Sequence, residues 1–313
     1  MAQQEPSIPL LAGVELGGTK CICILGSGPE QIRAQVELPT LTPRLTLAAI
    51  ESVLDGWRAR GWHFSALGLA AFGPLDLRRD SPRFGWVART VKEGWSDTDL
   101  LGRMARRYKV PAGIDTDVNA AARAEGRWGG AQALADYVYV TVGTGIGAGV
   151  VINGLPVCGA NHTELGHIRI VRMPGDHFAG ICPFHGDCLE GLAAGPAIAA
   201  RSQRDPDTLA PADPTWAPIA HALAQLCQTL VLGSAPRRIF LGGGVMAGQP
   251  QLFAMIRSRL QSSLNGYIAS DELGAGIERF IVPSALGLAV GPLGALAVAA
   301  DRLAKDVKQG REN

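Results

Sequence analysis

The stretches GVELGGTKCICIL at residues 13–25 and YVYVTVGTGIGAGVVI at residues 137–152 decide the fold of this chain. Each contains an apolar run, a turn rich in glycine and threonine, and a second apolar run. Short apolar runs bounded by such turns predict buried β-strands. In Walker and dinucleotide-binding motifs the glycine turn leads into a helix, whereas both turns here lead into another strand. The sequence therefore favours two related β-hairpins that hold a nucleotide between them.

The two hairpins indicate an internal duplication with two related lobes. A pair of ordinary glycine hairpin turns is the alternative, because glycine is common wherever two strands are joined tightly. A third glycine run, GGGV, follows the predicted strand RIFLGGG at 238–244 and supports the phosphate-binding interpretation.

The rest of the chain alternates between helical and strand patterns, which predicts an α/β protein. Apolar residues at helical spacing, as in TLAAIESVLDGWRAR, predict helices, and continuous apolar runs, as in ALGLAAFG, predict buried strands. We expect helices at 46–60, 118–129 and 219–234, strands at 66–73 and 238–244, and a final helix in the charged tail.

The amino-acid composition excludes some classes of function. Lys plus Arg number 29 and Asp plus Glu number 28 among 313 residues, which gives a net charge of +1 and no electrostatic drive toward nucleic acid or anionic membranes. No apolar stretch reaches the roughly 18 residues of a membrane span, and the N-terminus lacks the pattern of a secretory signal. We expect a soluble cytoplasmic protein with reduced cysteines.

The stretch CPFHGDCLEG at 182–191 has the composition of a metal site. Cys182, His185 and Cys188 offer two thiolates and one imidazole, and Zn²⁺ in proteins takes four such ligands. His167 in TELGH and His177 in PGDHFAG compete for the fourth place. Four protein ligands would close the site, so such a zinc would be structural. Two buried free thiols beside a surface histidine form the alternative.

The stretch DTDVN offers two carboxylates, Asp115 and Asp117, just before the alanine-rich helix. An aspartate that is ionised at neutral pH can orient a hydroxyl group and accept its proton late in a phosphoryl transfer. The alternative is that these residues only cap the helix.

The motifs GVELGGTK, FGPLD, DTDVNAAA, VTVGTGIGAG, TELGH, CPFHGDCLEG and FLGGGVM occur in this order. Together they resemble the ROK family of sugar kinases and repressors, and CPFHGDCLEG with FGPLD is similar to its bacterial fructokinases. The resemblance implies the actin-like ATPase (ribonuclease H-like) fold, with two lobes and a cleft between them. It further implies ATP with Mg²⁺ as cofactors, a hexose as substrate, and a homodimer.

The expected lobes follow from the position of these motifs. Residues 1–117 would form the N-terminal α/β lobe, completed by a C-terminal helix at 294–313. Residues 118–293 would form the larger C-terminal α/β lobe, which carries the zinc-binding loop.

The resemblance also implies roles for single residues. Asp117 matches the catalytic aspartate and Asn119 a sugar-binding asparagine, and His167 matches the fourth zinc ligand, with His177 held as the alternative. Glu164 and Glu190 are expected to accept hydrogen bonds from sugar hydroxyls, since an ionised carboxylate only accepts. The remaining sugar-side residues are expected to be Gly73, Pro74 and Lys92, with His167 also near the sugar. Lys92 could serve the sugar rim or an anionic group, and a solvated lysine is the alternative.

The nucleotide site is expected to use the three glycine runs. Glu15 stands where many sugar kinases of this superfold have aspartate, and it would help to hold hydrated Mg²⁺. The expected ATP-binding residues are Glu15, Gly17, Gly18, Thr19, Lys20, Gly143, Thr144, Gly145, Gly147, Gly242, Gly243 and Gly244.

The expected function is ATP-dependent phosphorylation of D-fructose to fructose 6-phosphate. A kinase for mannose, glucose or N-acetylmannosamine is the alternative, because the hydroxyl patterns of these sugars are similar. A sugar-sensing repressor would need a DNA-binding domain of about 60 residues ahead of the first glycine turn. A catalytically inactive sensor would have no use for Asp117.

Overall fold

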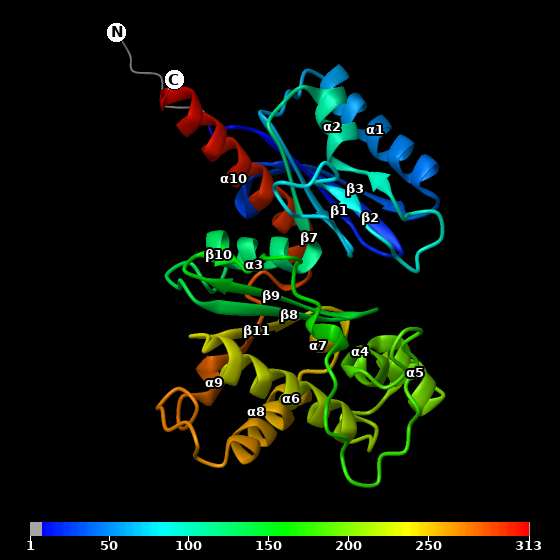
Figure 1. The fold of residues 1–313 in the computed structure, drawn as a ribbon, viewed down its shortest axis with the longest axis vertical. Coiled ribbons are helices and arrows are strands. Elements are labelled where there is room, and N and C mark those ends of the chain that lie inside the picture. The colour runs from blue at the N-terminus through cyan, green and yellow to red at the C-terminus, as the bar shows by residue number, and fades with distance from the viewer. Residues whose placement is uncertain (1–7, 313) are drawn as a thin grey trace. The chain divides into compact units, whose positions relative to one another are not determined.

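The computed structural model describes residues 8–312, which form two compact units (Figure 1). Unit 1 contains the chain up to Trp128, Cys158–His162, and the segment from Ala289 onward; unit 2 contains Gly129–Val157 and Thr163–Leu288. The division falls after Trp128 and not after the predicted Asp117, because helix α3 packs within unit 1. Residues 1–7, where we expect no secretory signal, and Asn313 lie outside the described residues.

Unit 1 is built on a five-stranded sheet with the order β3-β2-β1-β4-β7. The first glycine turn joins β1 and β2 as an antiparallel hairpin, and β4 and β7 continue the sheet parallel to β1. The strands are β1 (Leu11–Leu16), β2 (Lys20–Gly26), β3 (Ile32–Pro39), β4 (Ala66–Ala71) and β7 (Ala112–Thr116), with a separate two-stranded sheet of β5 (Trp86–Val87) and β6 (Thr98–Asp99).

Unit 2 repeats this topology. Its sheet has the order β10-β9-β8-β11-β12; β8 and β9 form an antiparallel hairpin around the second glycine turn, and β11 and β12 run parallel to β8. The strands are β8 (Tyr137–Val142), β9 (Ile146–Ile152), β10 (Leu155–Pro156), β11 (Ile239–Gly242) and β12 (Ile281–Pro283). The same strand order and directions in both units confirm the predicted duplication.

The helices cover the sheets much as the apolar patterns predict. α1 begins at Pro43, before the predicted Thr46, because proline suits the first helical position. In unit 1 the helices are α1 (Pro43–Ala59), α2 (Leu101–Tyr108), α3 (Asp117–Trp128) and α10 (Val290–Glu312). In unit 2 they are α4 (Leu189–Ala193), α5 (Gly195–Ser202), α6 (Trp216–Ser234), α7 (Gly244–Gly248), α8 (Gln251–Leu264) and α9 (Ile277–Phe280).

Helix α10 lies on three glycines that stand in register across neighbouring strands, Gly13, Gly68 and Gly113. A Cβ atom at Gly68 would lie 2.0 Å from the carbonyl oxygen of Ala295, so only glycine allows the helix to approach this closely. By length and composition α10 could also cross a membrane, but 56% of its apolar window is buried inside the protein. It is a core helix of unit 1.

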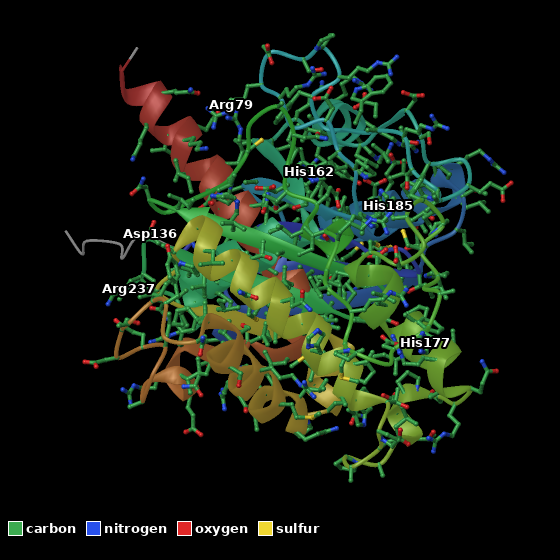
Figure 2. The ribbon with its side chains drawn as sticks, turned by 60° about the horizontal axis from the view of Figure 1, so that its bottom comes forward. Arg79, Asp136, His162, His177, His185 and Arg237 are labelled. Atoms are coloured by element: carbon green, nitrogen blue, oxygen red, sulfur yellow. The ribbon has the colours of Figure 1, made fainter. Side chains whose placement is uncertain are left out.

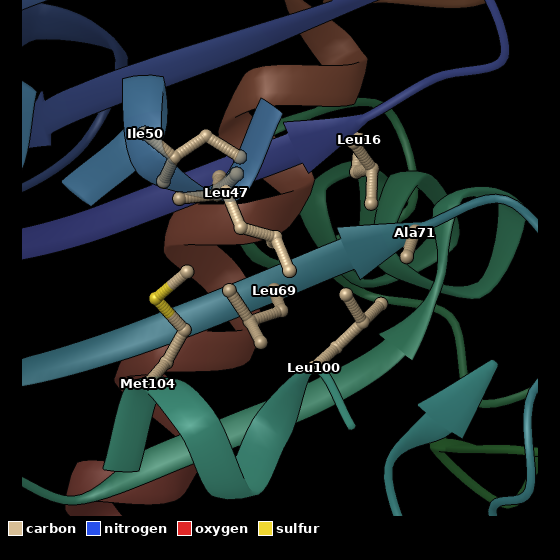
Figure 3. A pocket seen from close by; sticks show the side chains of 8 residues that line it. Leu16, Leu47, Ile50, Leu69, Ala71, Leu100 and Met104 are labelled. Atoms are coloured by element: carbon tan, nitrogen blue, oxygen red, sulfur yellow. The ribbon is translucent and has the colours of Figure 1, made fainter. Parts of the chain in front are cut away.

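The opposite face of this sheet packs against α1 and α2, which are joined by an ion pair between Arg103 and Glu51 with N–O distance 2.6 Å. A cavity of about 10 Å³ lies in this layer. Apolar side chains that include Leu16, Leu47 and Met104 line it (Figure 3). A space of this size is at the limit for a single water molecule and offers it no polar partner. It is a packing gap and not a ligand site.

Candidate active site

The first glycine turn of unit 1 is held by backbone hydrogen bonds and by Thr40. The Gly17 N–H donates to the Lys20 carbonyl at 3.0 Å, and the Thr40 hydroxyl donates to the Gly17 carbonyl at 2.9 Å. The Lys20 ammonium donates to Glu37 on β3 at 2.8 Å, and both side chains are more than half exposed. The lysine of this turn therefore faces β3, although the sequence predicts that it binds phosphate.

Glu15 stands near the end of β1, where its carboxylate touches the first turn of α10. A Cβ atom at Gly291 would lie 2.0 Å from its Oε1 atom. Burial, and next the charge of Asp117, raise the pKa of Glu15 to about 7. A divalent cation would stabilise a buried carboxylate whose pKa is raised by burial and by a neighbouring carboxylate. The carboxylates of Glu15 and Asp117 are therefore close enough within unit 1 for the charge of one to act on the other.

The two aspartates in DTDVN have different contacts at the start of α3. The Asn119 N–H donates to the Thr116 hydroxyl at 3.2 Å, so Thr116 is the residue that caps the helix. Asp117 is the first helical residue and is half-exposed; its Oδ1 accepts the Val118 N–H at 2.8 Å. Anionic side chains are favoured in this first turn. Asp117 thus keeps a carboxylate near Glu15 without serving as the cap.

Asp115, by contrast, belongs to a buried structural network. It accepts hydrogen bonds from the Asn119 amide at 2.8 Å and from Arg123 at 3.0 Å, and Arg123 also pairs with Asp301 of α10 at 2.7 Å. Asn119 is 1% exposed, and its Oδ1 finds no hydrogen-bond partner within residues 8–312. Buried carbonyl oxygens of this kind usually have a partner. The Asn119 Oδ1 atom is therefore an acceptor with no partner among residues 8–312, and the predicted sugar-binding role of Asn119 stays a prediction.

Unit 2 brings the second and third glycine runs together. Gly243, with φ 87°, packs so closely that a Cβ atom there would lie 2.4 Å from the Val142 carbonyl oxygen. A pocket of about 730 Å³ opens beside Gly143, Thr144 and Gly244. Its volume is in the range of small-molecule and cofactor sites. No motif predicts the part of the pocket lining that comes from α5 and from the segment Gln203–Asp207.

The four predicted metal ligands converge in unit 2. The ligand atoms of His167, Cys182, His185 and Cys188 all lie within 4.8 Å of one another. The Nδ1 atom of His167 is 3.5 Å from the Cys188 thiol, and that of His185 is 3.6 Å from the Cys182 thiol. His177, the alternative fourth ligand, does not join this group and lies in a separate loop (Figure 2). Two thiols and two imidazoles at these distances fit a tetrahedral zinc ion.

Glu190 follows the metal loop and reaches back to the second glycine turn. Its Oε2 accepts a hydrogen bond from the Ile146 N–H at 3.0 Å. Gly166 of TELGH packs on the same residue, because a Cβ atom there would lie 1.8 Å from the Ile146 carbonyl oxygen. Glu164, the other predicted sugar ligand, is exposed at the start of this turn. The Oε2 atom of Glu190 is therefore bound by the backbone, and Oε1 accepts no hydrogen bond within residues 8–312.

The FGPLD loop of unit 1 contains a cis peptide bond between Gly73 and Pro74, and both residues are half-exposed. His162 is buried, and its Nε2 accepts the Leu75 N–H at 3.0 Å, so it supports the loop from inside. Hydrogen bonds from Arg78 and then Ser81 lower the pKa of Asp76 to about 2. The sequence gives no partner for His162, since the partner is a backbone N–H distant along the chain.

Lys92, predicted at the sugar side, contacts the first glycine turn, and its role toward the sugar stays a prediction. Its ammonium donates a hydrogen bond to the carbonyl oxygen of Gly18 in the first glycine turn. A second lysine, besides Lys20, thus contacts this turn.

Comparisons with known proteins identify the family of this chain. The chain is 39% identical over 290 residues to a fructokinase of Pediococcus pentosaceus, covering 93% of this chain and 97% of that one. It is 40% identical to a fructokinase of Zymomonas mobilis, over 91% of this chain and 95% of that one. The crystal structure of a ROK hexokinase from Thermus thermophilus matches with a TM-score of 0.73 and 28% identity, covering 96% and 99%. Residues 11–302 match the ROK family, and the chain therefore belongs to it.

Proposed function

We propose that this protein is an ATP-dependent hexose kinase that converts D-fructose to fructose 6-phosphate. The single observation that carries the geometric argument is the carboxylate pair of Glu15 and Asp117 at the end of β1 and the start of α3. Relatives named fructokinase, at 39% and 40% identity over most of their length, support fructose as the acceptor.

Asp117 is proposed as the catalytic base. The hexose hydroxyl oxygen forms a bond to the γ-phosphorus of ATP while the bond to the β–γ bridging oxygen breaks, and ADP leaves. The hydroxyl proton passes to the Asp117 carboxylate, which also orients the hydroxyl. Bound Mg²⁺ would neutralise charge on the phosphates, and Glu15 would hold it through its water ligands. The raised pKa of Glu15 fits this role, because a cation would compensate the buried charge.

The proposed nucleotide site uses the glycine turns. The pocket beside Gly143, Thr144 and Gly244 in unit 2 has the volume of a nucleoside site. Backbone N–H groups of a glycine turn can surround phosphate oxygens. We assign the same phosphate-binding role to Gly17, Gly18 and Thr19 in unit 1.

We further propose that His167, Cys182, His185 and Cys188 bind one structural Zn²⁺. Four protein ligands leave no position for water or substrate, so the metal would hold the TELGH turn to the loop that carries Glu190. With Nδ1 of His167 turned toward the thiols, its Nε2 is left for a sugar hydroxyl. Glu164, Glu190 and Asn119 are the proposed acceptors for the other hydroxyls.

A homodimer that works in the cytoplasm remains our proposal from the family resemblance. Sedimentation of the purified protein at micromolar concentration tests the dimer directly.

A coupled assay of ADP release with Mg-ATP tests the function against fructose, mannose, glucose and N-acetylmannosamine. We expect saturable turnover with fructose and a kcat/KM for fructose well above the others. A higher kcat/KM for another hexose would assign the enzyme to that sugar. A chain without turnover on any of them, yet binding them in calorimetry, would be a sensor.

A further inference from the structure

Two lysines lie near the first glycine turn, and their surroundings differ. Lys20, inside the turn, is paired with Glu37 at 2.8 Å. Lys92 comes from a distant part of the chain and donates to the Gly18 carbonyl. No carboxylate lies within ion-pair distance of Lys92 in the described part of the chain.

The turn that carries Lys92 is fixed to the same part of unit 1. Trp95 is fully buried, its N–H donates to the Lys92 carbonyl at 3.1 Å, and its indole N–H donates to the Leu41 carbonyl at 2.8 Å. Leu41 follows Thr40, whose hydroxyl holds the glycine turn through the Gly17 carbonyl. The position of Lys92 over the turn is therefore built by buried side chains and backbone bonds, and does not depend on the lysine alone.

The ammonium of Lys92 has N–H donors beyond the one that binds the Gly18 carbonyl. A lysine carries three N–H donors, and one of them serves the Gly18 carbonyl. Gly18 is exposed, and a Cβ atom built on it would touch nothing within 4 Å, so space for a ligand exists at this point of the turn. Backbone N–H groups of a glycine turn can bind an oxyanion. An ammonium group beside the turn, without a carboxylate partner, strengthens such binding when the oxyanion carries a high negative charge.

From this geometry we propose that Lys92 binds the phosphoryl group that is transferred from ATP. It is then a catalytic residue and not a ligand of the sugar, and this assignment rests on the proposed kinase function. During transfer the new bond forms between the hexose oxygen and the γ-phosphorus, the bond to ADP breaks, and the proton goes to Asp117. Lys92 stabilises charge on the phosphoryl oxygens throughout, and neither gains nor loses a proton.

The test compares Lys92→Met and Lys92→Arg with Arg89→Met, which removes an exposed positive charge from the same loop. For Lys92→Met we expect kcat to fall about 100-fold, as for the loss of a transition-state donor, while KM for fructose stays within about twofold. Lys92→Arg should recover part of the rate, and Arg89→Met should behave as wild type. A raised KM for fructose at unchanged kcat would overturn the proposal and place Lys92 at the sugar.

Nucleotide binding without sugar gives a second readout that does not depend on turnover. Calorimetry with a non-hydrolysable ATP analogue and with ADP should show that Lys92→Met weakens the analogue about tenfold and leaves ADP unchanged. Equal affinities of wild type and Lys92→Met for the ATP analogue would overturn the proposal. The proposal would also be overturned if Lys20→Met, and not Lys92→Met, weakened binding of the analogue. If wild type phosphorylates no hexose, the kinase function fails, and these affinities still decide whether Lys92 meets the terminal phosphate.

Discussion

The Oε2 atom of Glu190 accepts a hydrogen bond from the backbone N–H of Ile146 at 3.0 Å. Glu190 follows the metal loop in sequence, and Ile146 begins the strand after the second glycine turn. The carboxylate thus ties the loop of the proposed sugar ligands to the turn that borders the proposed nucleotide pocket. A change at Glu190 can therefore affect both substrates.

Two variants of Glu190 separate these effects. Glu190→Gln keeps an oxygen acceptor for the Ile146 N–H but removes the charge, so we expect KM for fructose to rise about tenfold with KM for ATP unchanged. Glu190→Ala removes the tether as well, and KM for ATP should then rise too. Steady-state kinetics with each substrate varied in turn measure both values. Wild-type KM for fructose in Glu190→Gln would show that Glu190 does not bind the sugar.

Asp117 and Asp115 should respond oppositely to the same substitution. Asp117→Asn should lower kcat about 1000-fold through loss of the base and leave fructose binding in calorimetry intact. Asp115→Asn should instead weaken the ion pair with Arg123 and lower the free energy of unfolding by roughly 1.5–3 kcal/mol. Urea unfolding and kinetics on both variants make the comparison. Full turnover in Asp117→Asn would contradict its assignment as the base.

The metal site predicts about one zinc per chain in the purified protein. Cys188→Ser should lose this zinc, and its affinity for fructose should fall more than its affinity for ATP, because the cluster includes His167 and borders Glu190. Cys158→Ser is the matched control, since Cys158 is an exposed free cysteine outside the cluster. Elemental analysis and calorimetry give both readings. Purified wild-type protein without zinc would rule out the site.

Glu15 predicts a pH dependence of stability in magnesium-free buffer. Its pKa is raised from 4.5 to about 7, so the folded state binds more protons than the unfolded state between these values. Stability from this group is therefore greatest below pH 4.5, falls as the pH rises through this window, and levels off above about pH 7. The loss is at most about 3 kcal/mol.

The comparison with Glu15→Gln isolates this contribution. The variant should become more stable relative to wild type as the pH rises from about 4.5 to 7, since its amide does not ionise. Melting temperatures of both proteins across this range measure the difference. A constant difference at every pH would mean that Glu15 titrates normally.

The glycine contacts under α10 predict a steric effect on stability. Gly68→Ala places a methyl group against the Ala295 carbonyl and should lower the free energy of unfolding by about 1–3 kcal/mol. Gly56→Ala is the control: Gly56 is exposed in the interior of α1 with nothing within 4 Å of an added Cβ, and the change should stabilise by about 0.5–1 kcal/mol. Denaturant unfolding measures the free energy of unfolding of both variants. An unchanged free energy of unfolding in Gly68→Ala would contradict the close packing.

Local patterns predicted the elements that are defined by neighbouring residues. The strand–glycine turn–strand units, the alanine-rich helix and the cysteine–histidine spacing all lie within short stretches, so the sequence shows them directly. The fold class follows from their alternation, and the match to the ROK family confirms it.

Contacts between distant residues could not be read in this way. The Lys92 ammonium and the Gly18 carbonyl, or the His162 imidazole and the Leu75 N–H, meet only after the sheet has formed. The separate roles of Asp115 and Asp117 depend on the Thr116 cap, which is a matter of backbone geometry. A hydrogen bond to a backbone group cannot be predicted from the pattern of side chains, because nearly every residue carries the same backbone groups.

The packing of α10 on Gly13, Gly68 and Gly113 has a consequence for synthesis of the protein. These glycines emerge from the ribosome early, while α10 begins only at Val290, after the whole of the β8–β12 sheet. Domains generally fold as units during translation, N-terminal first. Here unit 2 can fold while the earlier strands of unit 1 still lack the helix that covers Gly13, Gly68 and Gly113. Nascent chains that stop short of Val290 should therefore depend on chaperones until that helix arrives.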